Sequence, residues 1–220
     1  MKSERLSRIA ANCEPARVVA DIGCDHGFLC AELIQSGRAE KAIAADISAG
    51  SLAKAESLAE QLGLAGQMEC RLGDGLSVLE PGEAEGIVIA GVGGPLIMSI
   101  LEQGWKVARG ARYLVLCPHN YPDSLRQYLN DSGFLIEREE ISREKGKFYP
   151  ILKVRVGQEP AYSPMELLVG RNAQRDAHWQ SYVQHEAMVQ KQIAKMAAGT
   201  LAAEKAEERL ALYQRALEEN

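Results

Sequence analysis

The sequence predicts an α/β fold in which a mostly parallel sheet is covered by helices on both faces, with an antiparallel hairpin at the sheet edge and a C-terminal helical arm. Two observations predict it. Short apolar runs alternate with amphipathic segments as far as residue 156, and no strand-like run follows that residue. Strands that alternate with helices form right-handed crossovers and a parallel sheet. The five runs are Val18–Ile22, Ala42–Ala45, Met68–Leu72, Gly86–Ala90 and Tyr113–Cys117.

Most of these runs are apolar throughout, as strands that are buried on both faces of a sheet should be. The run Met68–Leu72 differs, because Glu69 and Arg71 alternate with its apolar residues, and we expect it near a sheet edge. Between the runs, Leu52–Leu62 places its apolar residues at helical spacing, which predicts a helix that covers the sheet.

Two further β-rich runs, Phe134–Ile141 and Phe148–Val156, are joined by the polar segment Ser142–Lys147. This pattern predicts an antiparallel hairpin. Residues 157–164 then hold Gly, two Pro and Ser, a composition typical of a boundary. We therefore predict a sheet domain over residues 1–156, and a linker followed by a helical arm over residues 157–220.

The tail from Met165 onward contains no Pro and is rich in Ala, Gln, Glu, Lys and Leu. Gly199 and Thr200 offer a C-cap followed by an N-cap, which favours two helices folded as a hairpin or short coiled-coil arm. The arm is either a stabilising or dimerising appendage, which we favour, or a clamp for a substrate. The chain is then a monomer or a dimer through this arm.

Composition excludes several classes of protein. The 220 residues carry 25 basic and 30 acidic side chains, a net charge of −5, which excludes a strongly basic nucleic-acid coat but allows a local basic face. No apolar run approaches the roughly 20 residues that cross a bilayer. The five cysteines form no C-x-x-C pair, which argues against a disulfide framework and a structural zinc site. We expect a cytoplasmic protein that binds neither membranes nor DNA.

The loop after the first predicted strand reads D-x-G-x-D-x-G, from Asp21 to Gly27. A dinucleotide site needs G-x-G-x-x-G, so that backbone amides meet a pyrophosphate at a helix N-terminus. Here Asp25 stands at the second glycine position, where its carboxylate would repel a diphosphate. S-adenosylmethionine fits this loop better, because it has no phosphate and its sulfonium and ammonium groups are positive.

An acidic residue also stands at the end of each of the next two predicted strands. Asp46 lies 19 residues after Gly27 and can accept both hydroxyls of an adenosine ribose, whereas Asp74 can accept a hydrogen bond from an adenine amine. The alternative for each acid is to cap the following helix. The predicted cofactor-binding residues are Asp21, Gly23, Asp25, Gly27, Asp46, Ile47, Asp74, Gly75, Ala90 and Gly91.

Four motifs in order carry a family resemblance: 21–26 (DIGCDH), 73–76 (GDGL), 89–94 (IAGVGG) and 118–120 (PHN). Together with Gly146–Tyr149, they resemble the bacterial tRNA (adenine-22-N1)-methyltransferases over about the first 156 residues. The resemblance implies a Rossmann-like enzyme that uses S-adenosylmethionine to methylate N1 of an adenine in the D-loop region of tRNA. The chain departs from the family pattern at Val92, at Cys117–Asn120 and at Arg171.

The implied reaction needs no strong base, because the lone pair on N1 is free at neutral pH, but a carboxylate near the methyl group would stabilise the cationic product. Our candidates for the catalytic side chains are Asp25, His26 and Asn120. Two other classes stay open. One is a methyltransferase-like scaffold that binds RNA or a partner without catalysis. The other is a metal-dependent hydrolase, built from Asp25, His26, Asp46, Asp74 and His119.

Overall fold

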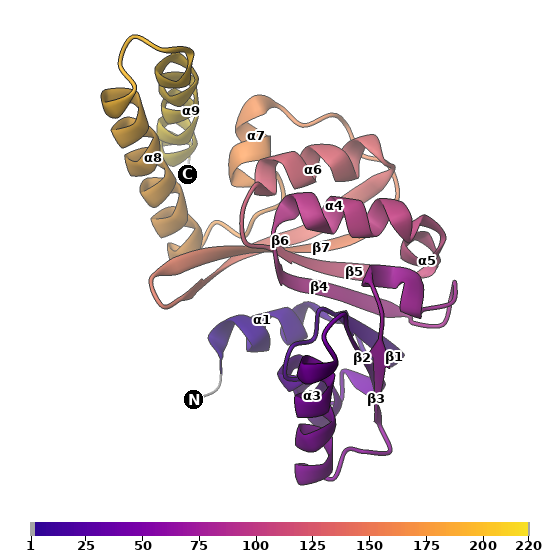
Figure 1. Cartoon of the computed structure of the whole chain (residues 1–220). Helices are drawn as coiled ribbons and strands as arrows, with labels where there is room; N and C mark the ends of the chain where they lie inside the picture. The colour runs from indigo at the N-terminus through magenta and orange to yellow at the C-terminus, as the bar shows by residue number, and fades with distance from the viewer. Residues whose placement is uncertain (1–2, 220) are drawn as a thin grey trace.

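The computed structural model describes residues 3–219 (Figure 1). Its strands are β1 (Ala16–Ile22), β2 (Ala39–Asp46), β3 (Met68–Leu72), β4 (Gly86–Val92), β5 (Tyr113–Pro118), β6 (Phe134–Glu144) and β7 (Lys147–Val156). Its helices are α1 (Glu4–Asn12), α2 (Phe28–Gln35), α3 (Ala49–Gln61), α4 (Gly94–Gln103), α5 (Trp105–Gly110), α6 (Pro122–Asp131), α7 (Pro164–Val169), α8 (Ala177–Met196) and α9 (Leu201–Glu218), with the 3-10 turn η1 (Gly75–Val78). The predicted α/β class is confirmed.

One seven-stranded sheet organises the molecule, in the order β3-β2-β1-β4-β5-β7-β6. Strands β1 to β5 pair in parallel, and β7 pairs antiparallel with both β5 and β6. The edge position predicted for Met68–Leu72 is confirmed. Because chain connections run outward from β1 on one side and from β4 on the other, the point between these two strands is the topological switch, where open α/β sheets bind ligands.

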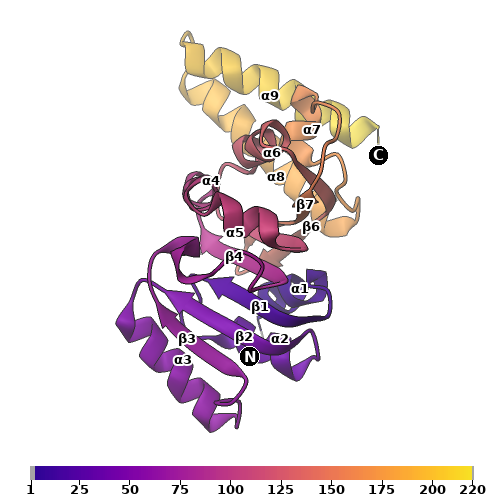
Figure 2. The same ribbon diagram turned by 90° about the vertical axis from the view of Figure 1, so that its right-hand side faces the viewer.

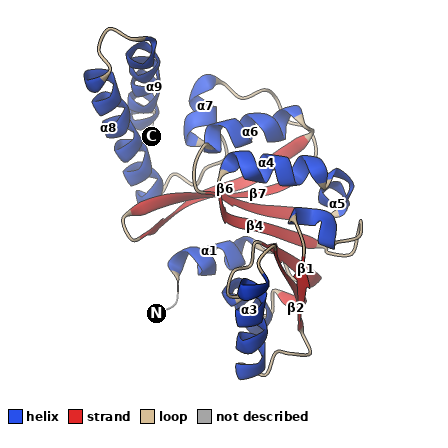
Figure 3. Ribbon diagram, viewed as in Figure 1, coloured by secondary structure: helices blue, strands red, loops and turns tan. Residues whose placement is uncertain are grey.

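Helices cover both faces of the sheet (Figure 3). On one face, α4, α5 and α6 pack over Ile22, Ile87 and Leu116. On the other face, α1 and α2 pack over Val19 and Val88, and α3 packs with α2 over Ala42 and Ala44 of β2. The central strands β1, β4 and β5 are largely apolar because they meet a helical layer on each side.

The β6–β7 hairpin is longer than its sequence suggested. We predicted a six-residue connection at Ser142–Lys147, but the strands continue to Glu144 and from Lys147, so that Lys145 and Gly146 alone make the turn. Both residues have positive φ, 49° and 79°, as a type I′ hairpin turn requires. The tip of the hairpin therefore extends past the sheet and lies near α1.

The predicted helical hairpin of the tail is confirmed (Figure 2). Thr200 caps α9, accepting a hydrogen bond from the Ala203 amide, and Gly199 before it has a φ of +80°. Trp179 is fully buried at the base of α8, and its indole N–H donates to the Val169 carbonyl at 2.9 Å. No helix within residues 3–219 is both long enough and apolar enough to span a membrane.

A buried ion pair fixes the arm to the sheet. The Arg126 guanidinium of α6 donates to the Glu139 carboxylate of β6 at 2.8 Å, and both side chains are excluded from solvent. Arg126 also donates to the Leu168 carbonyl, and the Glu139 backbone pairs with residues 172 and 174. The linker 157–176 is thus packed onto the sheet, and α8 and α9 alone extend away from it.

Arg171, where the family pattern differs, is part of this linker. Its guanidinium donates to the carbonyls of Pro160 and Ala161 and to the Glu166 carboxylate, and it lies 4.0 Å from the centre of the Tyr162 ring. Arg171 therefore holds the linker together and is not free to contact a ligand.

Candidate active site

A pocket of about 990 Å³ opens at the carboxyl ends of the parallel strands, over the switch point between β1 and β4. This volume lies at the upper end of what small-molecule sites occupy. Of the twelve positions proposed for catalysis or cofactor binding, taken together without repetition, ten line it. They are Asp21, Gly23, Asp25, His26, Asp46, Ile47, Asp74, Gly75, Ala90 and Gly91.

Asp46 connects two of the loops that form the floor of this pocket. One carboxylate oxygen accepts the Asp25 amide at 3.1 Å and the other accepts the Ser48 amide at 2.8 Å. The helix that follows is capped by Ser48, so Asp46 is not its cap. The Asp74 side chain likewise makes no capping hydrogen bond to η1. Both acids therefore keep carboxylate lone pairs directed at the pocket, as a ligand-binding role requires.

Asp25 and His26 form a pair at the pocket mouth. Asp25 has a φ of +49°, a strained conformation for a non-glycine residue, and its carboxylate lies 2.7 Å from Nδ1 of His26. The Asp25 side chain is 71% exposed. The imidazole in turn stacks on Phe28, with the ring centres 5.6 Å apart. The carboxylate thus orients the histidine and keeps its second oxygen open to the pocket.

Asp21 is the buried acid of the site. Burial, and then the nearby charge of Asp46, raise the pKa of the Asp21 carboxyl to about 7. Its one hydrogen-bond donor among the described residues is the weak thiol of Cys30, at 3.9 Å. A buried carboxylate without a strong donor favours a cationic ligand, because a positive group would compensate its charge. The acids therefore fit the positive charges of S-adenosylmethionine.

The glycines after β4 divide into two groups. Gly91, with a φ of +82°, forms an irregularity in the β4–β5 pairing and lines the pocket, where a Cβ would meet no described atom within 4 Å. Gly93 and Gly94 instead allow the β5–α6 loop to approach, since a Cβ on either would come within 2.8 Å of Asn120. Only the first of the three leaves backbone open to a ligand.

The structure places two predicted residues outside the pocket. The Asn120 carboxamide oxygen accepts the Gly94 amide at 3.2 Å at the start of α4, and Asn120 is not among the residues that line the large pocket. Gly27, with a φ of +71°, is buried under α3, and a Cβ there would lie 2.8 Å from Cβ of Ala55. We assign Gly27 to helix packing and Asn120 to positioning.

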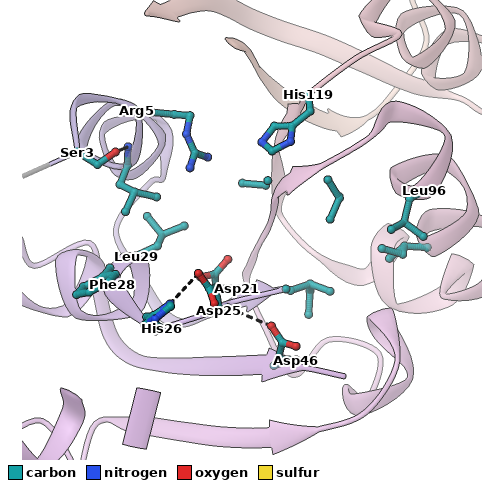
Figure 4. Close-up of a pocket in the computed structure, with 18 of the residues that line it drawn as sticks. Ser3, Arg5, Asp21, Asp25, His26, Phe28, Leu29, Asp46, Leu96 and His119 are labelled. Atoms are coloured by element: carbon teal, nitrogen blue, oxygen red, sulfur yellow. Dashed lines mark hydrogen bonds and ion pairs between the residues drawn. The ribbon is translucent and has the colours of Figure 1, made fainter. Parts of the chain in front are cut away.

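The sequence did not indicate that α1 and the hairpin tip close the pocket. Ser3 donates to the Glu144 carboxylate at 2.5 Å, and the Arg5 guanidinium lies 3.4 Å from the same group. Figure 4 shows Arg5 and His119 pointing into the space opposite Asp21, Asp25 and Asp46. Further lining residues that sequence reasoning missed are Ser3, Glu4, Leu6, Phe28, Leu29, Leu96, Ile100, Arg143, Glu144 and Lys145.

The geometry gives no support to a metal-dependent hydrolase. Within residues 3–219, no group of three His, Cys, Asp or Glu side chains is arranged to hold a metal ion. Asp21, Asp46 and Asp74 instead lie at or near the ends of three successive strands, β1, β2 and β3.

Comparison with known proteins identifies the family of this chain. The model of a methyltransferase domain family matches residues 2–152. A Bacillus subtilis (strain 168) protein, the tRNA (adenine(22)-N(1))-methyltransferase, is 34% identical over 206 residues, which cover 89% of this chain and 87% of the relative. The chain belongs to the tRNA (adenine(22)-N1)-methyltransferase family.

Solved structures extend the family match over the whole chain. The B. subtilis m1A22 tRNA methyltransferase superposes with a TM-score of 0.86 at 29% identity, covering 99% of each chain. A Streptococcus pneumoniae protein crystallised with S-adenosyl-L-methionine gives a TM-score of 0.89 at 31% identity, covering 99% of this chain and 100% of that one. The family fold therefore includes the helical arm as well as the sheet.

Proposed function

We propose that this chain transfers the methyl group of S-adenosylmethionine to N1 of adenine 22 in tRNA. The observation that carries the proposal is the pocket at the switch point. Four acids at or after successive strand ends, Asp21, Asp25, Asp46 and Asp74, line a space large enough for a cofactor and a base. The chain that holds this pocket matches the m1A22 methyltransferases along its length. When bound, the cofactor supplies an electrophilic methyl group. The acids fit its positive charge and its ribose and adenine donors.

Within this proposal, Asp46 holds the ribose hydroxyls and Asp74 the adenine amine, while Asp21 faces the positive groups. Asp25 lies at the mouth of the same pocket, next to His26, and its free oxygen is placed to stabilise the positive charge that passes to the base. Gly23, Ile47, Gly75, Ala90 and Gly91 shape the walls. Because N1 lies on the pairing edge of adenine, the base must leave its stack to reach this site.

The hairpin tip is the proposed contact for the tRNA backbone. Arg143, Lys145 and Lys147 are exposed and form no ion pair with any described carboxylate. By contrast, Arg8 of α1 is engaged with Glu140, and Arg17 of β1 is engaged with Glu85. We further propose that the sheet domain 1–156 carries the chemistry and that the arm within 157–220 positions the tRNA or a second copy of the chain.

The test is a methylation assay with a methyl-labelled cofactor and an unmodified tRNA transcript, followed by nucleoside mass analysis. We expect labelled 1-methyladenosine from a transcript with adenine at position 22 and none when guanine replaces it. Asp25→Asn should lower the rate, whereas Asp131→Asn, on the exposed end of α6, is the matched control and should not. Binding of the cofactor and tRNA without any methylation would contradict the proposal and favour the scaffold alternative.

A further inference from the structure

His119 lies on the wall between two cavities. It follows the buried end of β5 and lines the large pocket, and it also lines a second cavity of about 370 Å³ between the β5–α6 loop and the arm. In Figure 4 its ring points into the large pocket, across from Asp21, Asp25 and Asp46. The opposite wall is the floor proposed for the cofactor, so this ring faces the space left for the base.

The ring is held in place without using its nitrogens. The His119 amide donates to the Val92 carbonyl at 2.8 Å, and the imidazole meets the Tyr149 ring edge-to-face, with the centres 5.4 Å apart. The Arg5 guanidinium lies 5.2 Å from the centre of the Tyr149 ring. Neither imidazole nitrogen of His119 is hydrogen-bonded to another residue in the described part of the chain. The ring is therefore held in position while both of its nitrogens remain available to hydrogen-bond a ligand.

The surroundings keep this imidazole neutral. Burial, followed by the positive charges of Arg5 and Lys147, lowers the pKa of His119 below its ordinary 6.5. Glu144, an acid of the hairpin that lines the same pocket, is engaged by Ser3 and Arg5. A neutral imidazole has one nitrogen that accepts a hydrogen bond and one that donates.

Adenine presents matching chemistry at this point. Its N1 lone pair must face the methyl group, and the amine on the adjacent carbon then donates hydrogen bonds toward whatever lies beside it. We propose that His119 accepts a hydrogen bond from the N6 amine of the target adenine and is a specificity-determining residue of the site. Guanine carries an oxygen at that position and a hydrogen on N1, so it offers this site neither the amine nor the free N1 lone pair. This inference rests on the proposed function.

The same contact would also favour the reaction itself. As N1 attacks, its lone pair forms the bond to the methyl carbon, and the electron pair of the broken carbon–sulfur bond stays on sulfur, which becomes neutral. The positive charge passes to the adenine, where it makes the N6 hydrogens stronger donors. Because a charged donor strengthens a hydrogen bond, the contact with His119 is stronger in the transition state than in the bound substrate, and it raises kcat.

The test compares two proteins on two substrates. The wild type and His119→Phe, which keeps an aromatic ring against Tyr149, are assayed on tRNA transcripts with adenine or purine at position 22. Purine keeps N1 but lacks the N6 amine. Loss of one such hydrogen bond should lower kcat by about 10-fold. We expect this loss for the wild type on purine and for His119→Phe on adenine, with no further loss when the two changes are combined.

Two outcomes would overturn the inference: losses that multiply when the changes are combined, or an unchanged kcat of His119→Phe on adenine. Melting temperature and cofactor affinity, both expected to be unchanged, report whether the variant folds. If it does not fold, His119→Gln replaces it, and we expect that variant to keep the preference for adenine over purine because its amide oxygen accepts. An absence of 1-methyladenosine with the wild type would instead contradict the proposed function.

The pH profile adds a readout that a structural role would not move. Protonation removes the acceptor, so the wild-type kcat should fall as the pH drops through the lowered pKa of His119. His119→Phe should lack this acid limb. Besides Arg5 and Lys147, three sets of charged groups line the two cavities beside this ring, and all are retained in the variant. They are Arg143, Glu144 and Lys145 on the hairpin, Asp123, Glu186 and Arg209 in the second cavity, and Asp21, Asp25, Asp46 and Asp74 across the large pocket.

Discussion

Replacing Gly27 by Ala separates helix packing from ligand binding in the loop after β1. The sequence places this glycine in a cofactor-binding motif, whereas the structure places it beneath α3, away from the pocket lining. Gly37→Ala is the matched control, because Gly37 has the same φ of +71° and a Cβ there would meet no described atom within 4 Å. Both variants carry the backbone cost, and only Gly27→Ala carries the contact with Ala55.

The size of the effect follows from two terms. A left-handed conformation costs an alanine about 1–2 kcal/mol, and this term is common to both variants. A Cβ at residue 27 would lie 2.8 Å from Cβ of Ala55 and 3.2 Å from its Cα, well inside the optimal carbon–carbon separation. Overpacking of this kind costs about 1–3 kcal/mol. At about 2–4 °C per kcal/mol for a chain of this size, Gly27→Ala should melt about 2–12 °C below Gly37→Ala.

Thermal unfolding of both variants measures the difference, and calorimetric titration with S-adenosylmethionine at a temperature where both are folded measures affinity. We expect the affinity of Gly37→Ala to match the wild type and that of Gly27→Ala to fall modestly, as the loop 23–27 shifts. Equal melting temperatures together with a large loss of affinity in Gly27→Ala would refute the packing assignment. The glycine would then serve the close approach of a ligand.

Three other predictions follow from the described contacts. Asp46→Asn should weaken cofactor binding by about 10- to 100-fold, because hydrogen bonds to a charged group contribute about 1.5–3 kcal/mol; unchanged affinity in a calorimetric titration would remove the ribose assignment. Glu139→Gln should cost about 3–5 kcal/mol in urea unfolding, since it leaves the charge of Arg126 buried, and Glu139→Leu combined with Arg126→Met should recover most of that loss. The Asp21 carboxyl has a pKa of 3.8 in the unfolded chain and about 7 in the folded one, so between these values only the folded protein holds the proton. The stability that this proton contributes falls as the pH rises from 3.8 and is lost once the pH has passed 7. The melting temperature of Asp21→Asn relative to the wild type, without ligand, should therefore be higher at pH 8 than at pH 5, and a difference that does not change with pH would contradict this.

Strand positions could be predicted because burial on both faces leaves a continuous apolar run. Met68–Leu72 was predicted to the residue, and its alternating Glu69 and Arg71 correctly indicated an edge. The two-residue turn was predicted only as part of the longer segment Ser142–Lys147, because no residue of that segment is apolar and the ends of the two strands lack an apolar pattern. The short helix α7 was also missed, although Ser163 and Glu166 form a capping box that the sequence displays.

Residues of the site could be placed at a strand end more reliably than their side chains could be oriented. Asn120 follows β5 as predicted, but its carboxamide turns back to cap α4, an outcome decided by the glycines of a different loop. The contact of Arg5 with Glu144 joins residues 139 apart in sequence, and no local pattern predicts such a pair. Periodicity fixes which edge of the sheet a residue reaches, and only packing fixes where its side chain points.

The net charge of −5 is compatible with an RNA substrate because the charges lie in separate places. Asp21, Asp25 and Asp46 line the pocket, where a cationic ligand compensates their charge. Lys145 and Lys147, which form no ion pair with a described carboxylate, lie at the hairpin tip, which projects beyond the sheet. Salt screens exposed charges over about 8–10 Å, whereas buried charges are screened less. A phosphate at the tip therefore meets mainly the local positive charge, while the acids act on what enters the pocket.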